Sequence, residues 1–380
     1  MLKKYLIKGT VLFIAVIAII IAGCNDKYLT PQKKKEKPIK SNLDEIVSNV
    51  TTKKYIYGAV FHISTGDNSI DLKSASGNIN EDSQYYIASI NKLFISAIIL
   101  KLDTENKLDL DDKISKYLPE ELVNELHVYK GRDYSNDITI SHLMSHTSGL
   151  PCYLTDKQAD GKKAMDDFEA GIDQAWPIEK VIHEVKRMKT HFPPGKKGKA
   201  KYSDTNYQIL SLIIENITRK PINIVLNNMF QELNLTNTYV YEDVKENNFV
   251  PIRYKSDEIY LPQFFKSTKN DIISTAQDQM IFIRAFFGGN IFPKEKLKEL
   301  EKWNNIFFPF KYGVGIQKFY MPRILSPFQA VPDMVGHCGS TGSVAFYVPD
   351  KDIYITGTIN QQAKPNVAFQ AIIKIINEIE

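Results

Sequence analysis

Segments with strand patterns lie near both ends of this chain, and the residues between them have mostly helical patterns. Apolar runs bounded by turn residues predict four strands, at 55–64, 69–74, 343–348 and 353–359. Residues 89–287 show mainly helical spacing, and a last helical pattern covers 366–379. We therefore expect an α/β fold of the α+β type. Its antiparallel sheet is formed by N- and C-terminal segments and covered by helices, and an all-helical region is inserted between them.

From residue 42 onward the sequence has no second linker, low-complexity tract or internal repeat. The chain has 380 residues, of which 43% are hydrophobic and three are cysteines, so it can bury a core without disulfides or a structural metal. We therefore expect one domain at 42–380. The seam between its sheet and the inserted helices is the natural place for a cleft.

The first 23 residues have the pattern of a secretory signal peptide. Three lysines precede an uncharged apolar run at 11–22, which is short for a membrane-spanning helix and ends in Ala22-Gly23-Cys24. The small residues before Cys24 resemble a bacterial lipobox, in which the peptide is cut before the cysteine and the thiol is lipidated. An uncleaved anchor with an incidental cysteine is the alternative. Both predict a domain in the cell envelope, on the extracytoplasmic face of a bacterial membrane.

Residues 24–41 are rich in lysine, include prolines and lack apolar periodicity, which predicts a tether. The first 41 residues carry a net charge of +7, so the total of +4 leaves −3 for residues 42–380. Only six of the 48 basic residues are arginines, whereas recognition of phosphates and bases favours arginine. A nucleic-acid partner is therefore not expected.

The first candidate motif is Ser89 with Lys92, at the start of a predicted helix. The apolar residues that follow have amphipathic helical spacing, and Ser89 alone could be a helix N-cap. Lys92 lies one turn away on the same face, and its apolar surroundings predict partial desolvation, which favours the neutral amine. Because a neutral amine can accept the proton of a serine hydroxyl, the pair predicts a serine nucleophile with a lysine base.

Two further motifs lie later in the chain. Tyr202-Ser203-Asp204 precedes an apolar helical pattern, where Tyr202 could also be a core residue and Asp204 an N-cap. The segment 336–343 (GHCGSTGS) leads into a predicted strand. Its glycines would let the backbone approach a ligand and present N–H groups, although the segment could also be an ordinary turn.

Together these motifs resemble those of the serine β-lactamase and penicillin-binding-protein superfamily, on its class C β-lactamase, D-alanyl-D-alanine carboxypeptidase and esterase branch. The matches are the Ser-x-x-Lys motif of Ser89 and Lys92, then Tyr202-x-Asp204 and His337-x-Gly339. Three supporting segments also fit: 138–151, 274–278 and 312–315. The resemblance extends from about residue 43 to the C-terminus and implies a β-lactamase-like fold.

The resemblance also implies roles for these residues. Ser89 attacks a carbonyl carbon, and Lys92 and Tyr202 transfer the protons. The backbone N–H group of Ser89 helps to form an oxyanion hole. The other oxyanion and substrate-binding residues are Ser340, Asp204, His337 and Gly339. No metal and no organic cofactor is implied.

Two positions depart from the family pattern. Asp204 stands where the family has asparagine, which exchanges an amide for a carboxylate. His337 and Cys338 stand where β-lactamases have Lys-Thr, which removes a permanent cation. We therefore expect weak use of anionic β-lactams at pH 7. If His337 meets a substrate carboxylate, anionic substrates should gain relative to neutral ones towards pH 6, as His337 takes up a proton.

The predicted function is an extracytoplasmic, lipid-anchored serine hydrolase. It would act through an acyl-enzyme on a small ester, amide or D-amino-acid peptide, including a peptidoglycan-derived one. The alternative is a catalytically degenerate, penicillin-binding-like protein that binds peptidoglycan or a protein partner without turnover.

Three other residues are expected to be structural or are left open. We expect His146 to be a structural hydrogen-bonding residue rather than a base. Cys152 and Cys338 each lie beside a motif and could form a disulfide in an oxidising compartment, and free buried thiols are the alternative.

Overall fold

The computed structural model describes residues 38–241, 249–326 and 331–379. The predicted signal peptide, Cys24 and most of the tether lie outside the described residues. Helix α2 (Ile39–Thr51) begins within the segment predicted as a tether, because one more turn of helix precedes its buried residues Leu43 and Val47. This first helix therefore starts three residues before the domain boundary that the sequence predicted.

An eight-stranded antiparallel sheet forms the centre of the molecule. In spatial order its strands are β10 (Asn304–Phe307), β11 (Phe310–Tyr312), β12 (Gln317–Phe319), β13 (Met334–Cys338), β14 (Ser343–Val348), β15 (Ile353–Thr358), β1 (Gly58–Thr65) and β2 (Asp71–Gly77). Strand β1 pairs with β15 in a register that aligns Val60 with Thr358. The predicted sheet of N- and C-terminal segments is thus confirmed.

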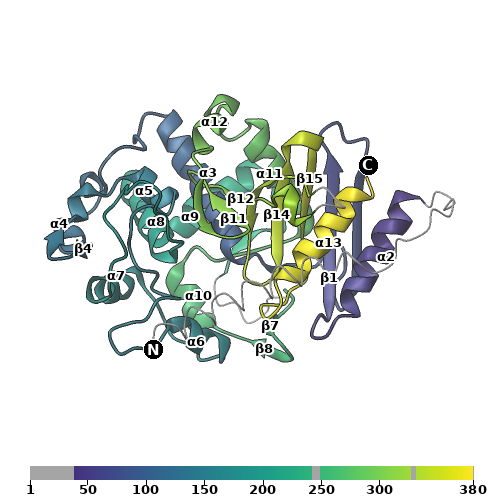
Figure 1. Ribbon diagram of the computed structural model, residues 1–380, viewed down its shortest axis with the longest axis horizontal. Helices are drawn as coiled ribbons and strands as arrows, with labels where there is room; N and C mark the ends of the chain where they lie inside the picture. The colour runs from purple at the N-terminus through teal and green to yellow at the C-terminus, as the bar shows by residue number, and fades with distance from the viewer. Residues whose placement is uncertain (1–37, 242–248, 327–330, 380) are drawn as a thin grey trace.

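Two terminal helices cover one face of this sheet. Helix α13 (Asn366–Asn377) lies beside α2 across the strands, as Figure 1 shows in yellow and purple. Their apolar residues and the inward side chains of the strands form one core, in which Phe319 stacks on Phe369. Burial of this apolar surface is the main stabilising contribution on that side.

The other face of the sheet carries α11 (Ala276–Gly288) and α3 (Asn91–Thr104), which pack together through stacked Phe94 and Phe282. Beyond them lies the inserted helical region, on the left of Figure 1. Its helices are α4 (Glu120–Val123), α5 (Ile140–Met144), α6 (Ala164–Glu169), α7 (Ile178–Arg187), α8 (Asp204–Thr218), α9 (Ile222–Glu232) and α10 (Pro262–Thr268). Helix α8 contacts α3, α5, α7 and α9, so it joins the inserted region to the sheet side of the molecule.

The inserted region is mostly helical, as predicted, but it also contains short strands. Strand β9 (Ile272–Ser274) pairs with β3 (Tyr85–Tyr86) on one side and with β6 (Tyr239–Val240) on the other. Two small hairpins are β4 (Val128–Tyr129) with β5 (Arg132–Asp133), and β7 (Ile252–Tyr254) with β8 (Asp257–Ile259). Strands of two or three residues are too short to give a period-2 pattern, so the sequence did not predict them.

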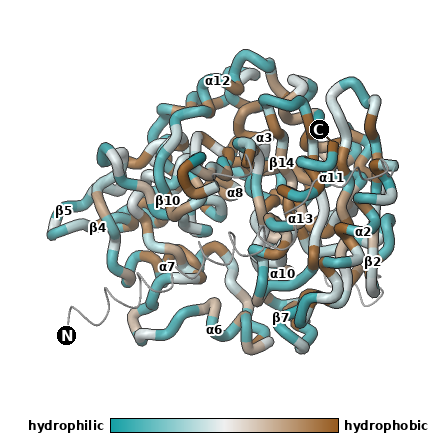
Figure 2. The backbone as a smooth tube through the Cα atoms, turned by 45° about the vertical axis from the view of Figure 1, so that its right-hand side comes forward, coloured by the Kyte–Doolittle hydropathy of each residue, from teal (hydrophilic) through white to brown (hydrophobic). Residues whose placement is uncertain are grey.

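Hydrophobic residues are concentrated in the sheet and the central helices, and hydrophilic residues in outlying segments such as the β4–β5 hairpin (Figure 2). Among the described residues, no helix has the length and apolar character needed to span a bilayer.

Candidate active site

Ser89 lies in a single 3₁₀ turn, Ala88–Ile90, between strand β3 and helix α3. Ala88 has a φ of +50°, a left-handed conformation that is uncommon for alanine and turns the chain sharply before the serine. Helix α3 begins at Asn91, and its N-cap has no side-chain hydrogen bond. Ser89 is therefore not the helix N-cap, and its partly exposed side chain is available to a substrate.

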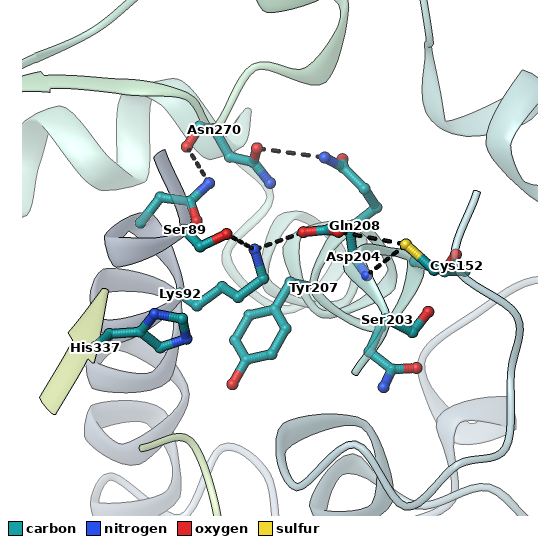
Figure 3. Close-up of polar contacts among 12 residues, drawn as sticks. Ser89, Lys92, Cys152, Ser203, Asp204, Tyr207, Gln208, Asn270 and His337 are labelled. Carbon is teal, nitrogen blue, oxygen red and sulfur yellow. Dashed lines mark hydrogen bonds and ion pairs between the residues drawn. The ribbon is translucent and has the colours of Figure 1, made fainter. Parts of the chain in front are cut away.

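Lys92 lies between Ser89 and Asp204. Its Nζ atom donates to Ser89 Oγ at 3.1 Å and forms an ion pair with Asp204 Oδ1 at 2.7 Å (Figure 3). The Lys92 side chain is 5% exposed, so this pair is shielded from water. The predicted burial of Lys92 is confirmed, and the structure adds a carboxylate partner that the sequence did not predict.

Asp204 is the first residue of helix α8, and Ser203, not Asp204, occupies the N-cap position. A carboxylate in the first turn of a helix is stabilised by the free N–H groups there. The Cys152 thiol donates to Asp204 Oδ2 at 3.3 Å, and the Asp204 N–H donates to Cys152 Sγ at 3.4 Å. These contacts fix the carboxylate, with one oxygen towards Cys152 and the other towards Lys92.

Tyr202 precedes this helix, and its ring lies 4.4 Å from that of His146 and 5.3 Å from Lys92 Nζ. Burial raises the pKa of the Tyr202 phenol well above its usual value, the Asp204 charge adds to the shift, and the Ser89 hydroxyl opposes it. The phenol is therefore protonated at neutral pH. In that state Tyr202 can donate a proton but cannot first act as a base.

His337 is 1% exposed on strand β13, and both of its ring nitrogens are engaged. Its Nδ1 atom lies 2.8 Å from the Cys338 carbonyl oxygen, so it carries the proton, and Nε2 accepts from the Tyr312 hydroxyl at 3.0 Å. Burial, followed by the nearby charge of Lys92, lowers the pKa of His337 to about 3. The expectation that His337 becomes a cation towards pH 6 is therefore wrong for the free protein, because the protonated ring would be buried beside a lysine.

Five aromatic and imidazole side chains pack together behind Ser89 and form what we call the neutral cluster. Its members are His146, Tyr202, Tyr207, Tyr312 and His337. Burial is the main cause that raises the pKa of each tyrosine and lowers the pKa of each histidine, so all five are uncharged at neutral pH. His146 is fully buried and accepts the Ser203 N–H at 3.2 Å through Nδ1, which agrees with its predicted structural role.

The third motif ends strand β13 and turns back into β14 against the Ser89 turn. A Cβ atom on Gly339 would lie 2.5 Å from the Ile87 carbonyl oxygen and 2.2 Å from Ser343 Oγ, so only glycine fits there. The Ser343 hydroxyl donates to the same Ile87 carbonyl at 2.7 Å. Gly339 therefore packs closely against the chain just before Ser89, a contact that the sequence did not predict.

A cavity of about 190 Å³ opens beside Ser89. The predicted residues that line it are Ser89, Lys92, Tyr202, Asp204 and Ser340, whereas His337 and Gly339 lie behind its wall. Its apolar lining comes from Tyr86, Tyr153, Leu154, Met165, Phe168 and Phe264. The remaining lining residues are Ala88, Tyr207 and five polar residues that the sequence did not single out: Asn91, Thr155, Gln208, Asn270 and Asp271. Asn91 lies inside the Ser-x-x-Lys motif, but no sequence signal marked the other four.

Cys152 and Cys338 are free thiols, so the alternative without a disulfide is the one the structure shows. The Cys338 thiol donates to Gln317 Oε1 at 3.1 Å. Within the described part of the chain, no three His, Cys, Asp or Glu side chains are arranged to hold a metal ion.

Sequence comparison relates the chain to known proteins. The family model "Beta-lactamase" matches residues 43–376. "Protein flp" of Staphylococcus aureus (strain NCTC 8325 / PS 47) is 31% identical over 157 residues, which are 41% of this chain and 28% of that protein. The match thus spans little more than a quarter of that relative.

Two solved structures have a similar fold. A D-stereospecific amidohydrolase from Streptomyces sp. superposes with a TM-score of 0.71 at 23% identity, covering 88% of this chain and 98% of that one. The D-amino acid amidase of Ochrobactrum anthropi SV3, complexed with L-phenylalanine amide, gives 0.72 at 17% identity, covering 90% and 98%. Since the family model matches nearly all of the described residues, the chain belongs to the beta-lactamase family of serine hydrolases.

Proposed function

We propose that this protein hydrolyses a small ester, amide or D-amino-acid peptide through an acyl-enzyme on Ser89. The observation that carries the proposal is the 3.1 Å contact from Lys92 Nζ to Ser89 Oγ at the edge of a cavity. A nucleophile within hydrogen-bond reach of a group that can take its proton is the basic requirement for covalent catalysis. The amidohydrolase and amidase among the structural neighbours support amides as one substrate class.

In the proposed reaction, a proton shifts from Lys92 to Asp204 within the ion pair, which leaves the pair uncharged and makes the amine an acceptor. Ser89 Oγ then bonds to the carbonyl carbon as its proton passes to Lys92. The protonated Tyr202 phenol donates to the leaving atom as the bond to that atom breaks, and Lys92 restores the phenol proton. A water molecule releases the acyl group by the reverse sequence.

The developing oxyanion needs donors at fixed positions. We propose that the N–H groups of Ser89 and Ser340 supply them, since both residues line the cavity. Loss of one such donor in comparable sites costs roughly 3–4 kcal/mol of transition-state stabilisation. The close fit of Gly339 against Ile87 would hold the two N–H groups in register.

We expect poor turnover of anionic β-lactams at both pH 7 and pH 6. His337 is buried and uncharged, so it supplies no cation for a substrate carboxylate. Neutral p-nitrophenyl esters and D-Ala-D-Ala peptides should be used better than penicillin or a cephalosporin. A penicillin kcat/KM of about 10⁶ M⁻¹s⁻¹ or more, within the range of efficient enzymes, would contradict this expectation.

We also propose that the domain acts outside the cytoplasm, attached to a bacterial membrane through lipidated Cys24, close to peptidoglycan-derived substrates. The support is the signal-peptide pattern of residues 1–23 and the lysine-rich segment that follows. Incorporation of a radiolabelled fatty acid into the wild-type protein, and its loss in Cys24→Ala, would test the anchor. Labelling that persists in Cys24→Ala would contradict it.

Hydrolysis of p-nitrophenyl acetate by wild type and Ser89→Ala separates the enzyme from the non-catalytic alternative. The proposal predicts saturable hydrolysis by wild type and only background hydrolysis by the variant. Equal rates would favour a binding protein that has lost turnover.

A further inference from the structure

The cavity beside Ser89 has a carboxylate that proton transfer does not use. Asp271 is 5% exposed and lines the cavity just before strand β9. Its oxygens accept from the Tyr86 hydroxyl at 2.5 Å and from the Thr268 hydroxyl. The Ile87 N–H donates to the Ile272 carbonyl at 3.1 Å, which ties the Asp271 segment to the strand that leads into Ser89. Asp271 is therefore held in a fixed position relative to the nucleophile.

The charges around the cavity do not balance. Of the described residues that line it, three carry a side-chain charge at neutral pH when ionised: Lys92, Asp204 and Asp271. Lys92 is paired with Asp204, and no lysine, arginine or histidine in the described ranges forms an ion pair with Asp271. Burial of such a carboxylate is costly without a cation. The cavity is therefore short of one positive charge.

The pKa of Asp271 agrees with this imbalance. Burial raises it, while the hydroxyl groups of Thr268 and Tyr86 and the more distant charge of Lys92 lower it. Two neutral donors stabilise a carboxylate less than a cation does, so a bound ammonium would lower the free energy of the ionised form.

A second acceptor in the same wall lacks a donor. Asn91 is 8% exposed and lines the cavity, and its Nδ2 atom donates to the Asn270 carbonyl at 3.0 Å. This bond leaves Asn91 Oδ1 facing no donor among the described residues. Figure 3 shows Asn270 on the opposite side of Lys92 from Tyr207 and His337, so this wall lies apart from the neutral cluster.

The rest of the lining limits the size of the acyl group. The aromatic side chains of Tyr153, Phe168 and Phe264 also line the cavity, and the cavity volume is about 190 Å³. Pockets for drug-sized ligands have roughly 300–1,000 Å³, so this cavity fits a smaller group. A short side chain with a nearby ammonium, as in an amino acid, matches both the volume and the acceptors.

We propose that Asp271 and Asn91 bind the ammonium of an aminoacyl group, so that the preferred substrates are esters or amides whose acyl part is an amino acid with a free amine. The ammonium offers three donors, which the Asp271 carboxylate and Asn91 Oδ1 can accept. This inference rests on the proposed acyl-enzyme and specifies which acyl group Ser89 receives.

The test compares alanine p-nitroanilide with its N-acetyl derivative, each in D and L forms. Wild type should favour the free amine in at least one configuration. In Asp271→Asn, the ratio of kcat/KM for the amine to that for the N-acetyl compound should fall roughly 10- to 100-fold, the effect of losing a charged hydrogen bond. Asp82→Asn, which removes the same charge from a side chain that is 89% exposed, should leave the ratio unchanged. A ratio within twofold of wild type in Asp271→Asn would overturn the proposal.

A second measurement uses wild type alone, so it holds even if Asp271→Asn does not fold. Alaninamide should slow labelling of Ser89 by a fluorophosphonate at concentrations where N-acetylalaninamide does not. Equal protection by both amides would overturn the aminoacyl proposal while leaving the acyl-enzyme intact. Failure of the fluorophosphonate to label Ser89 at all would instead overturn the proposed function, and this inference with it.

Discussion

On the ionic side of the site, beside Ser89, Lys92 and Asp204 form a buried ion pair at 2.7 Å, whereas the five residues of the neutral cluster, two of which pack against Lys92, carry no charge. Both sides are built from residues far apart in the sequence, and both exclude water. The two sides differ in the kind of polar contact that each contains. The ion pair holds two opposite charges, between which the proposed reaction moves a proton, while the neutral cluster fixes ring orientations through bonds such as that from Tyr312 to His337.

This difference assigns separate tasks to the two sides. In the proposed reaction, the proton of Ser89 passes to the ionic side, where Lys92 lies 3.1 Å from Ser89 Oγ. Of the three protonated phenols in the neutral cluster, Tyr202 is the one proposed to donate to the leaving atom, and the others hold the site in shape. Because His337 is buried and uncharged, it supplies no cation for a substrate carboxylate.

We expect the largest loss of activity from substitutions of Lys92 on the ionic side. Lys92→Arg should lose activity almost as fully as Lys92→Ala, by roughly 10⁴-fold in kcat/KM, at the upper end of the range for general acid–base catalysis. Arginine can keep the ion pair with Asp204 but cannot become a neutral acceptor. Kinetics with p-nitrophenyl acetate provide the measurement. Activity of Lys92→Arg within tenfold of wild type would show that the lysine acts only through its charge.

The next effect concerns Tyr202, the residue of the neutral cluster that donates a proton to the leaving atom in the proposed reaction. Tyr202→Phe should slow hydrolysis by roughly 10²–10³-fold, because it removes the phenol proton but keeps the packing against His146. The loss should be greater for an anilide than for a nitrophenyl ester, since an amine leaving group needs a proton more. Losses that are equal and only a few-fold for both substrates would reduce Tyr202 to a packing residue.

A third change tests whether the third motif positions Ser89. Gly339→Ala should destabilise the fold by up to about 3 kcal/mol, because the added methyl group meets the Ile87 carbonyl oxygen and Ser343 Oγ. Chemical denaturation of both proteins measures the change in the free energy of unfolding. A difference below about 0.5 kcal/mol would mean that the turn moves freely and that its fit does not hold Ser89.

The smallest expected effect is a pH dependence of the free energy of unfolding, which tests whether His337 is uncharged in the folded protein. His337 has a folded-state pKa of about 3, below the value of about 6.5 in the unfolded chain, so the unfolded state binds more protons between these values. The stability that comes from keeping His337 neutral is fully present above pH 6.5 and falls as the pH drops towards 3. Between pH 7 and pH 5, wild type should lose about 2 kcal/mol more than His337→Gln.

The comparison with His337→Gln removes the contributions of other titrating groups. His146 and the carboxylates are present in both proteins, so their contributions cancel from the difference in lost stability. Denaturation at pH 7 and pH 5 gives the four free energies needed. If wild type and His337→Gln lose equal stability on acidification, His337 is already protonated or solvated in the folded protein. The neutral cluster would then carry a charge, and the comparison of the two sides would fail.

The sequence predicted the elements of this site that depend on local spacing. Ser89 and Lys92 are one helical turn apart, so their contact follows from the motif itself. The pairing of β1 with β15 followed from strand patterns at both ends of the chain. Strands β10, β11 and β12 have three or four residues each, which is too short for a recognisable period-2 pattern in the sequence, so they were missed.

The elements that were not predicted depend on how distant segments meet. The burial of His337 arises because β13 lies in the middle of the sheet behind α3, which no residue near the motif reveals. The ion pair of Lys92 with Asp204 joins two helices, and a single sequence gives no distance between them. Asp271 directly precedes a three-residue strand, so its place in the cavity wall became visible only once β9 was paired with β3.

The central claim is that Ser89 is the nucleophile, and intact-protein mass spectrometry after exposure to a fluorophosphonate tests it most directly. The account predicts one covalent adduct on folded wild-type protein, located by proteolysis on the peptide that contains Ser89. Ser89→Ala should acquire no adduct at that peptide under the same conditions. Folded wild type that remains unmodified, or that carries its adduct on another serine, would contradict the account.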